Sequence, residues 1–160
     1  MNAILRNVPR LVPMTVGDLD IVTSIEGAAY PFPWTRGNFI DSLAAGYTAR
    51  VLLDEGQLTI GYFVVMGGVD EMHLLNITVA PAEQGRGHGR RMLDEVVAMC
   101  RACNAPKLWL EVRESNAGAQ ALYLRYGFMH LGVRRGYYPA ADGQREDATV
   151  MSLDIDGAGP

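Results

Sequence analysis

The spacing of hydrophobic residues in the first half of the chain predicts two helices, a β-hairpin and a further strand. Apolar residues recur at helical intervals at Leu19, Val22, Ile25 and Ala29. The prolines of "YPFPWT" end that helix, and Thr35 is a suitable N-cap for a second helix that ends near Gly46. Strands are expected over 47–53, 58–66 and 72–79, with the turn residues "DEGQ" joining the first two.

Helices and strands alternate in the second half. A helical stripe is formed by Met92, Leu93, Val96, Val97 and Cys100. The strand "KLWLEV" places Leu108, Leu110 and Val112 on one face and Trp109 and Glu111 on the other. Ser115 or Asn116 caps a further helix, Gly127 ends it, and strands follow over 128–138 and 148–155. The order ααβββαβαββ predicts an α/β (α+β) fold with a mixed, mostly antiparallel sheet flanked by helices.

Composition and charge narrow the class of protein. The 160 residues predict a single domain over 1–160 with a core of about 10–155. A net charge of -4 gives no general attraction to nucleic acid or to an anionic membrane. No apolar run is long enough to cross a bilayer, and the first residues lack the apolar core of a signal peptide. We therefore expect a cytoplasmic protein with no nucleic-acid or membrane partner.

The run "QGRGHGRR", residues 84–91, lies between a strand and a helix. Backbone N–H groups at the start of a helix have no intrahelical partner, and glycines allow the backbone to approach an anion closely. The run lacks the G-K-[ST] ending of a P-loop. It also fails the G-x-G-x-x-G dinucleotide pattern, because Arg90 stands where the third glycine is needed. The pattern alone leaves a diphosphate-binding loop and a merely flexible loop open.

Longer segments carry a family resemblance. "NITVAPAEQGRGHGRRML" resembles the Q/R-x-x-G-x-G/A loop of the GNAT superfamily of N-acetyltransferases, with Gln84, Gly87 and Gly89 at its defining positions. "AAYPFPWT", "HLLNITV", "LWLEVRESNAGAQALYLRYGF", "RRGYYP" and "REDATVMSL" are similar to the RimI-type ribosomal-protein alanine N-acetyltransferases. The sequence departs from that group at Gln144, which is inserted before the "RED" run of the tail loop.

The resemblance implies a GNAT-like domain with splayed central strands and acetyl-CoA as co-substrate. The residues that it assigns to acetyl-CoA are Ile77, Thr78, Val79, Gln84, Gly85, Arg86, Gly87, His88, Gly89, Arg90 and Asn116. A backbone N–H group near 77–79 would stabilise the oxyanion. The acceptor implied is the N-terminal alanine of a ribosomal protein, that of the small subunit numbered eighteen.

Two side chains are candidates for the proton transfers. An α-amine is mostly protonated at neutral pH, because its ordinary pKa is about 7.7–8.0, so its attack on a thioester needs a base. The resemblance implies Glu111 as this base and Tyr123 as the acid that protonates the leaving thiolate. The residues alone also allow other roles: Glu111 as a surface glutamate paired with Lys107 or an arginine, and Tyr123 as a core tyrosine like Tyr126.

The acceptor-side residues and the remaining polar residues are less specific. Phe32 and Trp34 are expected on one wall of a peptide groove, and Tyr137 and Tyr138 on another, although ordinary packing explains each equally well. The carboxylates of "RED" either attract a basic peptide or end a solvated hairpin. The three histidines are His73, His88 and His130, and neither their spacing nor "CRAC" indicates a metal site.

Two further functions stay open at the level of the sequence. One is an acetyltransferase for lysine side chains or small amines. The other is a non-catalytic acyl-CoA-binding module, which the presence of both Glu111 and Tyr123 disfavours.

Overall fold

The computed structural model describes residues 8–156 and divides them into two compact units. The first unit contains residues 8–65 and 76–92, and the second contains 66–75 and 93–156. The single domain expected from the chain length stays a prediction. Among the described residues, no helix is long and apolar enough to cross a membrane, and no three His, Cys, Asp or Glu residues gather as metal ligands would.

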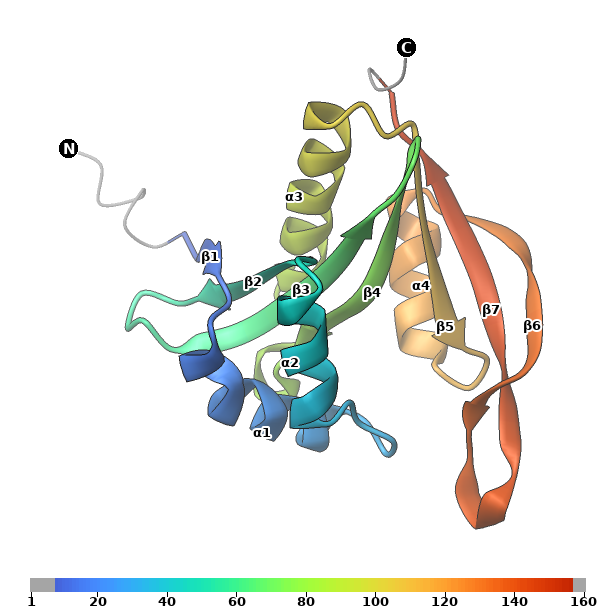
Figure 1. Cartoon of the computed structure of the whole chain (residues 1–160), viewed down its shortest axis with the longest axis horizontal. Helices are drawn as coiled ribbons and strands as arrows, with labels where there is room; N and C mark the ends of the chain where they lie inside the picture. The colour runs from blue at the N-terminus through green and yellow to red at the C-terminus, as the bar shows by residue number, and fades with distance from the viewer. Residues whose placement is uncertain (1–7, 157–160) are drawn as a thin grey trace. The chain divides into compact units, whose positions relative to one another are not determined.

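The first unit combines antiparallel strands with two helices (Figure 1). Its elements are β1 (Arg10–Pro13), α1 (Leu19–Ala29), α2 (Arg36–Ala44), β2 (Thr48–Leu53), β3 (Thr59–Gly67) and the second half of β4 (Glu71–Val79). Strand β3 belongs to this unit as far as Val65. Its strand order is β1-β2-β3-β4. The helices α1 and α2 lie on one face of these strands, and their buried side chains include Leu19, Val22 and Phe39. The cap predicted for α2 is confirmed, because the Thr35 hydroxyl accepts a hydrogen bond from the Asn38 N–H at 3.1 Å.

The second unit has the strand order β4-β5-β7-β6. Its elements are the first half of β4, α3 (His88–Ala102), β5 (Lys107–Arg113), α4 (Ala117–Tyr126), β6 (Met129–Pro139) and β7 (Arg145–Asp154). Helix α3 belongs to this unit from Leu93 onward. The pairs β5–β7 and β7–β6 are antiparallel. Strands β4 and β5 are parallel and are paired over only four residues, up to Leu74 and Leu110, as expected where central strands splay.

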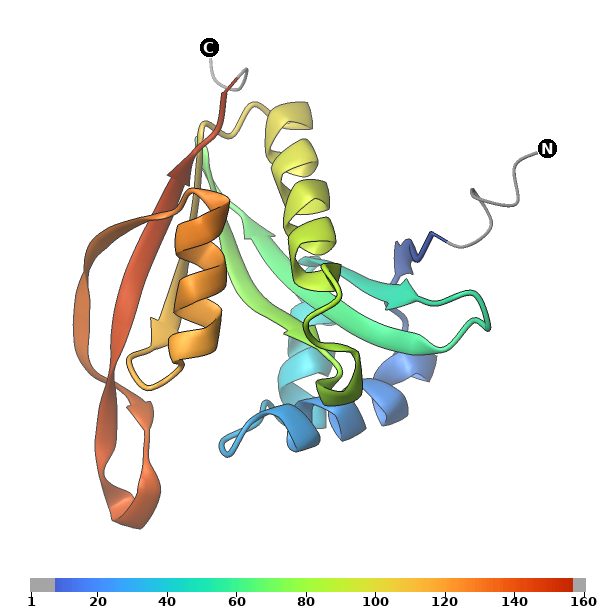
Figure 2. The same ribbon diagram turned by 180° about the vertical axis from the view of Figure 1, so that it is seen from behind.

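The two faces of the second unit have different environments. Cys100 of α3 places its Sγ 3.7 Å from the Sδ of Met72, and Met72 lies opposite Leu108 on β5. Helix α3 therefore covers the face that carries Met72 and Leu108, and α4 lies on the same side (Figure 2). Because strand side chains alternate, Trp109 and Glu111 lie on the face opposite these helices, as the sequence predicted.

One strand was not predicted, and another begins earlier than predicted. β1 was missed, because four residues at an edge, of which only the middle two are half-buried, leave no clear alternation in the sequence. β7 begins at Arg145 rather than at 148, since β6 and β7 stay paired out to Pro139 and Arg145. The "RED" run looks like a loop in the sequence, but the side chains of Arg145 and Asp147 bond the β6 backbone at Gly136, and that of Glu146 bonds Arg113 and Ser115.

Candidate functional site

The glycine run of the first unit has the backbone geometry of an anion-binding loop. It follows a short 3-10 turn, Pro81–Glu83, and leads directly into α3. Gly85 and Gly87 have φ of 78° and 85°, in the left-handed region that favours glycine. The N–H of Arg91 donates to the carbonyl oxygen of Gly87 at 3.0 Å, and the N–H groups before it lie in the first turn. N–H groups in the first turn of a helix are suited to bind a phosphate.

Side chains of the loop hold it in place. The Gln84 Nε2 donates to the backbone oxygen of Val79 at 3.2 Å, which ties the loop to the end of β4. The Arg86 guanidinium lies 3.3 Å from the Glu83 carboxylate and keeps a side-chain exposure of 64%. His88 lies 3.8 Å from the same carboxylate. The resemblance assigned Gln84 to acetyl-CoA binding, and its side chain bonds the protein's own backbone.

A buried polar network lies under β4 and was not predicted from the sequence. Glu26 is only 2% exposed. Its Oε1 accepts hydrogen bonds from the Tyr62 hydroxyl at 2.7 Å and from the Asn76 Nδ2 at 3.0 Å. Its Oε2 accepts from the backbone N–H of Trp34 at 2.9 Å. The sequence held one signal for this network, since Glu26 directly follows Ile25 in the apolar stripe of its helix.

The same network continues along β4 to the residues assigned to acetyl-CoA. The Thr78 hydroxyl donates to the Asn76 Oδ1 at 2.7 Å. The Tyr30 hydroxyl lies 2.8 Å from the Thr78 Oγ1 and donates to the Ile77 carbonyl oxygen at 3.2 Å. Burial raises the pKa of Tyr30 to about 12, so this hydroxyl stays a donor. The Thr78 side chain is therefore occupied within the protein.

The two candidates on the first acceptor wall have different surroundings. Trp34 is half-buried, and its ring packs against Phe39 with centroids 5.1 Å apart. Its backbone N–H is held by Glu26. Phe32 is 39% exposed. Packing accounts for Trp34, whereas Phe32 presents apolar surface.

Glu111 is buried beside a histidine of the neighbouring strand. Its side chain is 6% exposed, and its Oε1 lies 2.7 Å from the Nε2 of His73. The alternative of a surface glutamate paired with Lys107 or an arginine is therefore wrong. Among the described residues no donor meets Oε1 in hydrogen-bond geometry, although the side chains of His73 and Tyr137 lie close enough to stabilise the charge of the carboxylate. A buried carboxylate oxygen with unused acceptor capacity is suited to take a proton.

The charge of Glu111 is stabilised by its neighbours. Burial alone favours the neutral acid, but the side chains of His73 and Tyr137 and the charge of Arg134 hold the pKa of Glu111 below its usual value. Burial and Glu111 together raise the pKa of the Tyr137 hydroxyl to about 12. Glu111 is thus ionised, and Tyr137 is neutral, throughout the neutral pH range.

Trp109 completes this cluster. Its ring stacks on His73 with centroids 3.6 Å apart and planes 11° apart. The Arg134 guanidinium lies 5.7 Å from the Trp109 ring and 5.5 Å from the Tyr137 ring. The indole N–H of Trp109 is buried and has no partner among the described residues. Sequence reasoning missed His73 because it lies 38 positions before Glu111 and meets it only through the parallel pairing of β4 with β5.

Helix α4 carries the second catalytic candidate. Tyr123 is 7% exposed, and its ring lies 5.5 Å from that of Phe128. The Tyr126 hydroxyl, in contrast, donates to the Asp94 carboxylate at 2.7 Å. Asn116 caps the helix by accepting a hydrogen bond from the Ala119 N–H at 3.2 Å, and its amide nitrogen bonds no described residue. The burial of Tyr123 is compatible with either packing or catalysis.

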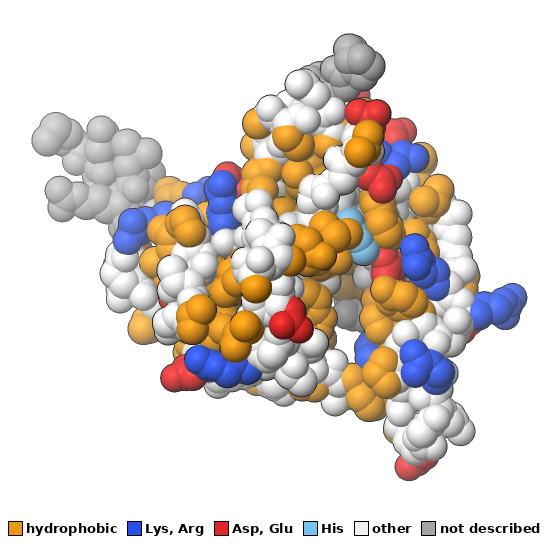
Figure 3. Space-filling model, viewed as in Figure 1, with side chains coloured by type: hydrophobic (Ala, Val, Ile, Leu, Met, Phe, Trp, Pro, Cys, Tyr) orange, Lys and Arg blue, Asp and Glu red, His pale blue; other side chains and the backbone are white. Residues whose placement is uncertain are grey.

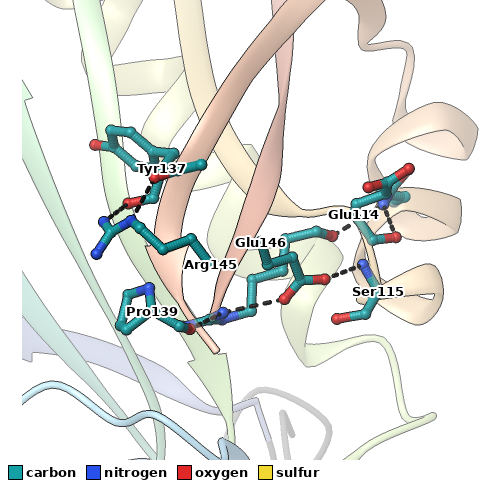
Figure 4. A network of polar contacts seen from close by, with 9 residues as sticks. Glu114, Ser115, Tyr137, Pro139, Arg145 and Glu146 are labelled. Carbon is teal, nitrogen blue, oxygen red and sulfur yellow. Dashed lines mark hydrogen bonds and ion pairs between the residues drawn. The ribbon is translucent and has the colours of Figure 1, made fainter. Parts of the chain in front are cut away.

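The acidic residues of the "RED" run bond two different neighbours of β7: Glu146 bonds β5 and the loop after it (Figure 4), and Asp147 bonds β6. Glu146 accepts hydrogen bonds from Arg113 at 3.0 Å and from the backbone N–H of Ser115 at 2.7 Å. Those contacts hold the pKa of Glu146 below its usual value. Asp147 accepts from the Gly136 N–H at 2.8 Å. Neither carboxylate ends a merely solvated hairpin, and both are engaged within the protein.

The same network sets the backbone that carries the aromatic pair of β6. Arg145 donates to the carbonyl oxygen of Gly136 at 2.6 Å and to that of Tyr137 at 2.9 Å. The Arg113 guanidinium lies over the Tyr138 ring, with its carbon 4.5 Å from the ring centroid. Tyr137 stays 40% exposed. The space-filling view shows hydrophobic and basic side chains interspersed over β6 (Figure 3).

Comparisons with known proteins bear on this arrangement. Residues 19–128 match the model of the acetyltransferase (GNAT) family. The ribosomal protein bS18-alanine N-acetyltransferase of Escherichia coli strain K12 is 38% identical over 138 residues, 86% of this chain and 92% of that protein. The enzyme of the same name from Haemophilus ducreyi is 35% identical over 136 residues, 85% and 93% of the two chains.

Solved structures support the same relationship. The crystal structure of the ribosomal-protein-S18-alanine N-acetyltransferase from Escherichia coli superposes with a TM-score of 0.84 at 36% identity, covering 95% of this chain and 97% of that one. The fold class and the family resemblance expected from the sequence are both confirmed. The chain belongs to the acetyltransferase (GNAT) family, in the group of the ribosomal-protein-alanine N-acetyltransferases.

Proposed function

We propose that this protein transfers the acetyl group of acetyl-CoA to the N-terminal α-amine of a ribosomal protein, the alanine of small-subunit protein eighteen. One observation carries the proposal: Glu111 is an ionised, buried carboxylate, and among the described residues no donor meets its Oε1 in hydrogen-bond geometry. An acceptor ammonium supplies the donor that this oxygen lacks. The names of the similar enzymes support the choice of acceptor.

The loop of the first unit would hold the donor. Backbone N–H groups at the start of α3 bind the pyrophosphate, and the left-handed backbone at Gly85 and Gly87 presents them. Arg86 and Arg90 add positive charge. The pantetheine arm follows the β4 backbone over 77–79, where an N–H group also meets the oxyanion.

The chemistry would belong to two residues of the second unit. Glu111 accepts one proton from the acceptor ammonium, and the free amine attacks the thioester carbon. The carbon–nitrogen bond forms first and leaves an oxyanion on the former carbonyl oxygen, and the carbon–sulfur bond breaks as that carbonyl re-forms. Tyr123 donates its hydroxyl proton to the departing thiolate, and the second proton that the nitrogen loses as it becomes an amide restores the Tyr123 hydroxyl. The unused amide nitrogen of Asn116 is available to coenzyme A while its oxygen caps α4.

The acceptor peptide would meet exposed aromatic surface. Phe32 and Tyr137 are both exposed enough to contact a peptide. Trp34 and Tyr138 act mainly by packing, since one is held against Phe39 and the other lies under Arg113. Because the carboxylates of "RED" are engaged in the hairpin, they shape its backbone rather than attract a basic peptide directly.

Replacing Gly87 with valine is expected to weaken acetyl-CoA binding about tenfold or more, since a β-branched residue at positive φ costs roughly 1–3 kcal/mol. The added Cβ meets no protein atom within 4 Å, so the effect comes from the backbone conformation, φ 85°, rather than from crowding inside the protein. Isothermal titration calorimetry measures it. Gly67→Val, at a glycine that also has open space but no positive φ, is the matched control. Equal acetyl-CoA affinities of the two variants would show that the loop does not bind acetyl-CoA.

The acceptor is tested with peptides and acetyl-CoA. We expect a peptide with the N-terminal sequence of the ribosomal protein to be acetylated on its α-amine, and a peptide with a blocked N-terminus but free lysines to be left unmodified. Tandem mass spectrometry locates the added group. Modification of lysine alone, or of a small amine in preference to both peptides, would overturn the proposed acceptor while leaving an acetyltransferase. Binding of acetyl-CoA without any transfer would indicate an acyl-CoA-binding module.

A further inference from the structure

His73 is a polar side chain in contact with Glu111 that the proposed reaction does not use. It lies on β4, one strand away from β5, and its side chain is 13% exposed. Its Nε2 is 2.7 Å from the Glu111 Oε1, and its ring is held flat against Trp109. Its contact with Glu111 and its stack on Trp109 together fix both the position and the plane of the imidazole ring.

The position of His73 matters because the Glu111 carboxylate has a low affinity for a proton. Its neighbours favour the ionised form of its carboxylate. A proton taken from an ammonium group, which holds protons far more tightly than a carboxylate, must therefore move on quickly for attack to proceed. Imidazole is the side chain suited to take up and release protons near neutral pH.

We propose that His73 is a positioning residue that aligns the Glu111 carboxylate and passes the acceptor's proton from Glu111 to solvent. This inference rests on the proposed function, in which Glu111 is the base. His73 is held beside Glu111 by its stack on Trp109, the residue opposite it in the β4–β5 pairing.

The proton balance has three steps. An N–H bond of the acceptor ammonium breaks and an O–H bond forms on Glu111, leaving the neutral amine. That O–H bond then breaks as Nε2 of His73 binds the proton. The Nδ1–H bond finally breaks and releases a proton to water, which restores the carboxylate and leaves the imidazole as its neutral Nε2–H tautomer. Exchange of the ring protons with water returns the Nδ1–H tautomer before the next turnover. No electrons are exchanged, and no further reactant is needed.

The charged and titratable groups around Glu111, apart from His73, come from β6. Arg134, Tyr137 and Tyr138 face Glu111, and burial together with the carboxylate raises the pKa of both tyrosines. From β7, the residue opposite Glu111 is Val150, which does not titrate. Both tyrosines therefore stay protonated near neutral pH, and neither can accept a proton from Glu111.

His73→Gln tests the relay by kinetics. Glutamine can still donate a hydrogen bond to Glu111 but cannot carry a proton onward. We expect kcat for α-amine acetylation to fall about tenfold or more, with both KM values nearly unchanged and the pH dependence of kcat altered. His130→Gln, a histidine on β6 outside the cluster, is the control and should match the wild type. A wild-type kcat and pH profile in His73→Gln would overturn the inference.

Chemical rescue separates proton transfer from packing. In His73→Ala, added imidazole should restore kcat several-fold, because it can occupy the vacated place beside Trp109 and accept a proton. Pyrazole has nearly the same shape but is a much weaker base. Equal rescue by the two rings would show that His73 only fills space, and would overturn the relay.

A third measurement does not depend on activity. The nitrogen-15 NMR titration of His73 in the free protein should shift when Glu111 is replaced by glutamine, because the two groups are coupled at 2.7 Å. An unchanged titration would overturn the relay. If the wild type acetylates no peptide α-amine, the proposed function fails, and this titration still decides whether His73 and Glu111 form a proton-exchanging pair.

Discussion

Glu111→Gln is expected to lower kcat for peptide acetylation about 100-fold or more, the usual scale for the loss of a general base. Glutamine has nearly the shape of glutamate, so the buried site stays filled, but its amide cannot accept the proton of the acceptor ammonium. Steady-state kinetics with a peptide acceptor measures kcat, and calorimetry measures acetyl-CoA affinity, which should stay close to that of the wild type.

Glu114→Gln is the matched control for this result. Glu114 is exposed just after β5, so removing its charge should leave kcat unchanged. A wild-type kcat in Glu111→Gln would reject Glu111 as the base. A loss of acetyl-CoA affinity that matched the loss of kcat would assign it to cofactor binding instead.

The same variant has a consequence for stability that depends on pH. Although burial disfavours the charge of Glu111, His73, Tyr137 and Arg134 hold its pKa below the usual value. A depressed carboxyl pKa contributes stability above the unfolded pKa, and this contribution is lost as pH falls through the folded pKa. The difference in unfolding free energy between the wild type and Glu111→Gln should therefore shrink on acidification, which chemical denaturation at several pH values measures.

Tyr123→Phe is expected to lower kcat about tenfold to 100-fold, because the leaving thiolate loses its proton donor. Phenylalanine keeps the ring that packs against Phe128, so the fold should be preserved. The acetyl-CoA affinity should change little. Kinetics with peptide acceptors, together with a thermal unfolding scan, measures the two effects separately.

Tyr126 supplies the control on the same helix. Tyr126→Phe removes the hydrogen bond to Asp94 and should cost about 0.5–1.5 kcal/mol of stability without lowering kcat. If Tyr123→Phe shows the same pattern, lower stability and an unchanged kcat, then Tyr123 is a core residue and another donor protonates the thiolate.

The sequence by itself determined most of the helices and strands, β1 excepted, and the chemistry of local segments. Alternation in "KLWLEV" placed Glu111 opposite Leu108 and Leu110, and the structure agrees because neighbouring side chains of any strand point to opposite faces. The glycine spacing excluded two other phosphate loops before any fold was considered. The positive φ at Gly85 and Gly87 follows from the same local preference.

The tertiary structure alone decided which distant side chains meet. His73 reaches Glu111 because β4 pairs with β5 in parallel, in a register that sequence patterns do not specify. Glu26 meets Tyr62 and Asn76, 36 and 50 positions away. Backbone preferences act over a few residues, whereas these contacts depend on strand order and on the burial of charges that must find partners. For that reason the candidate base was visible in the sequence, and its histidine neighbour was not.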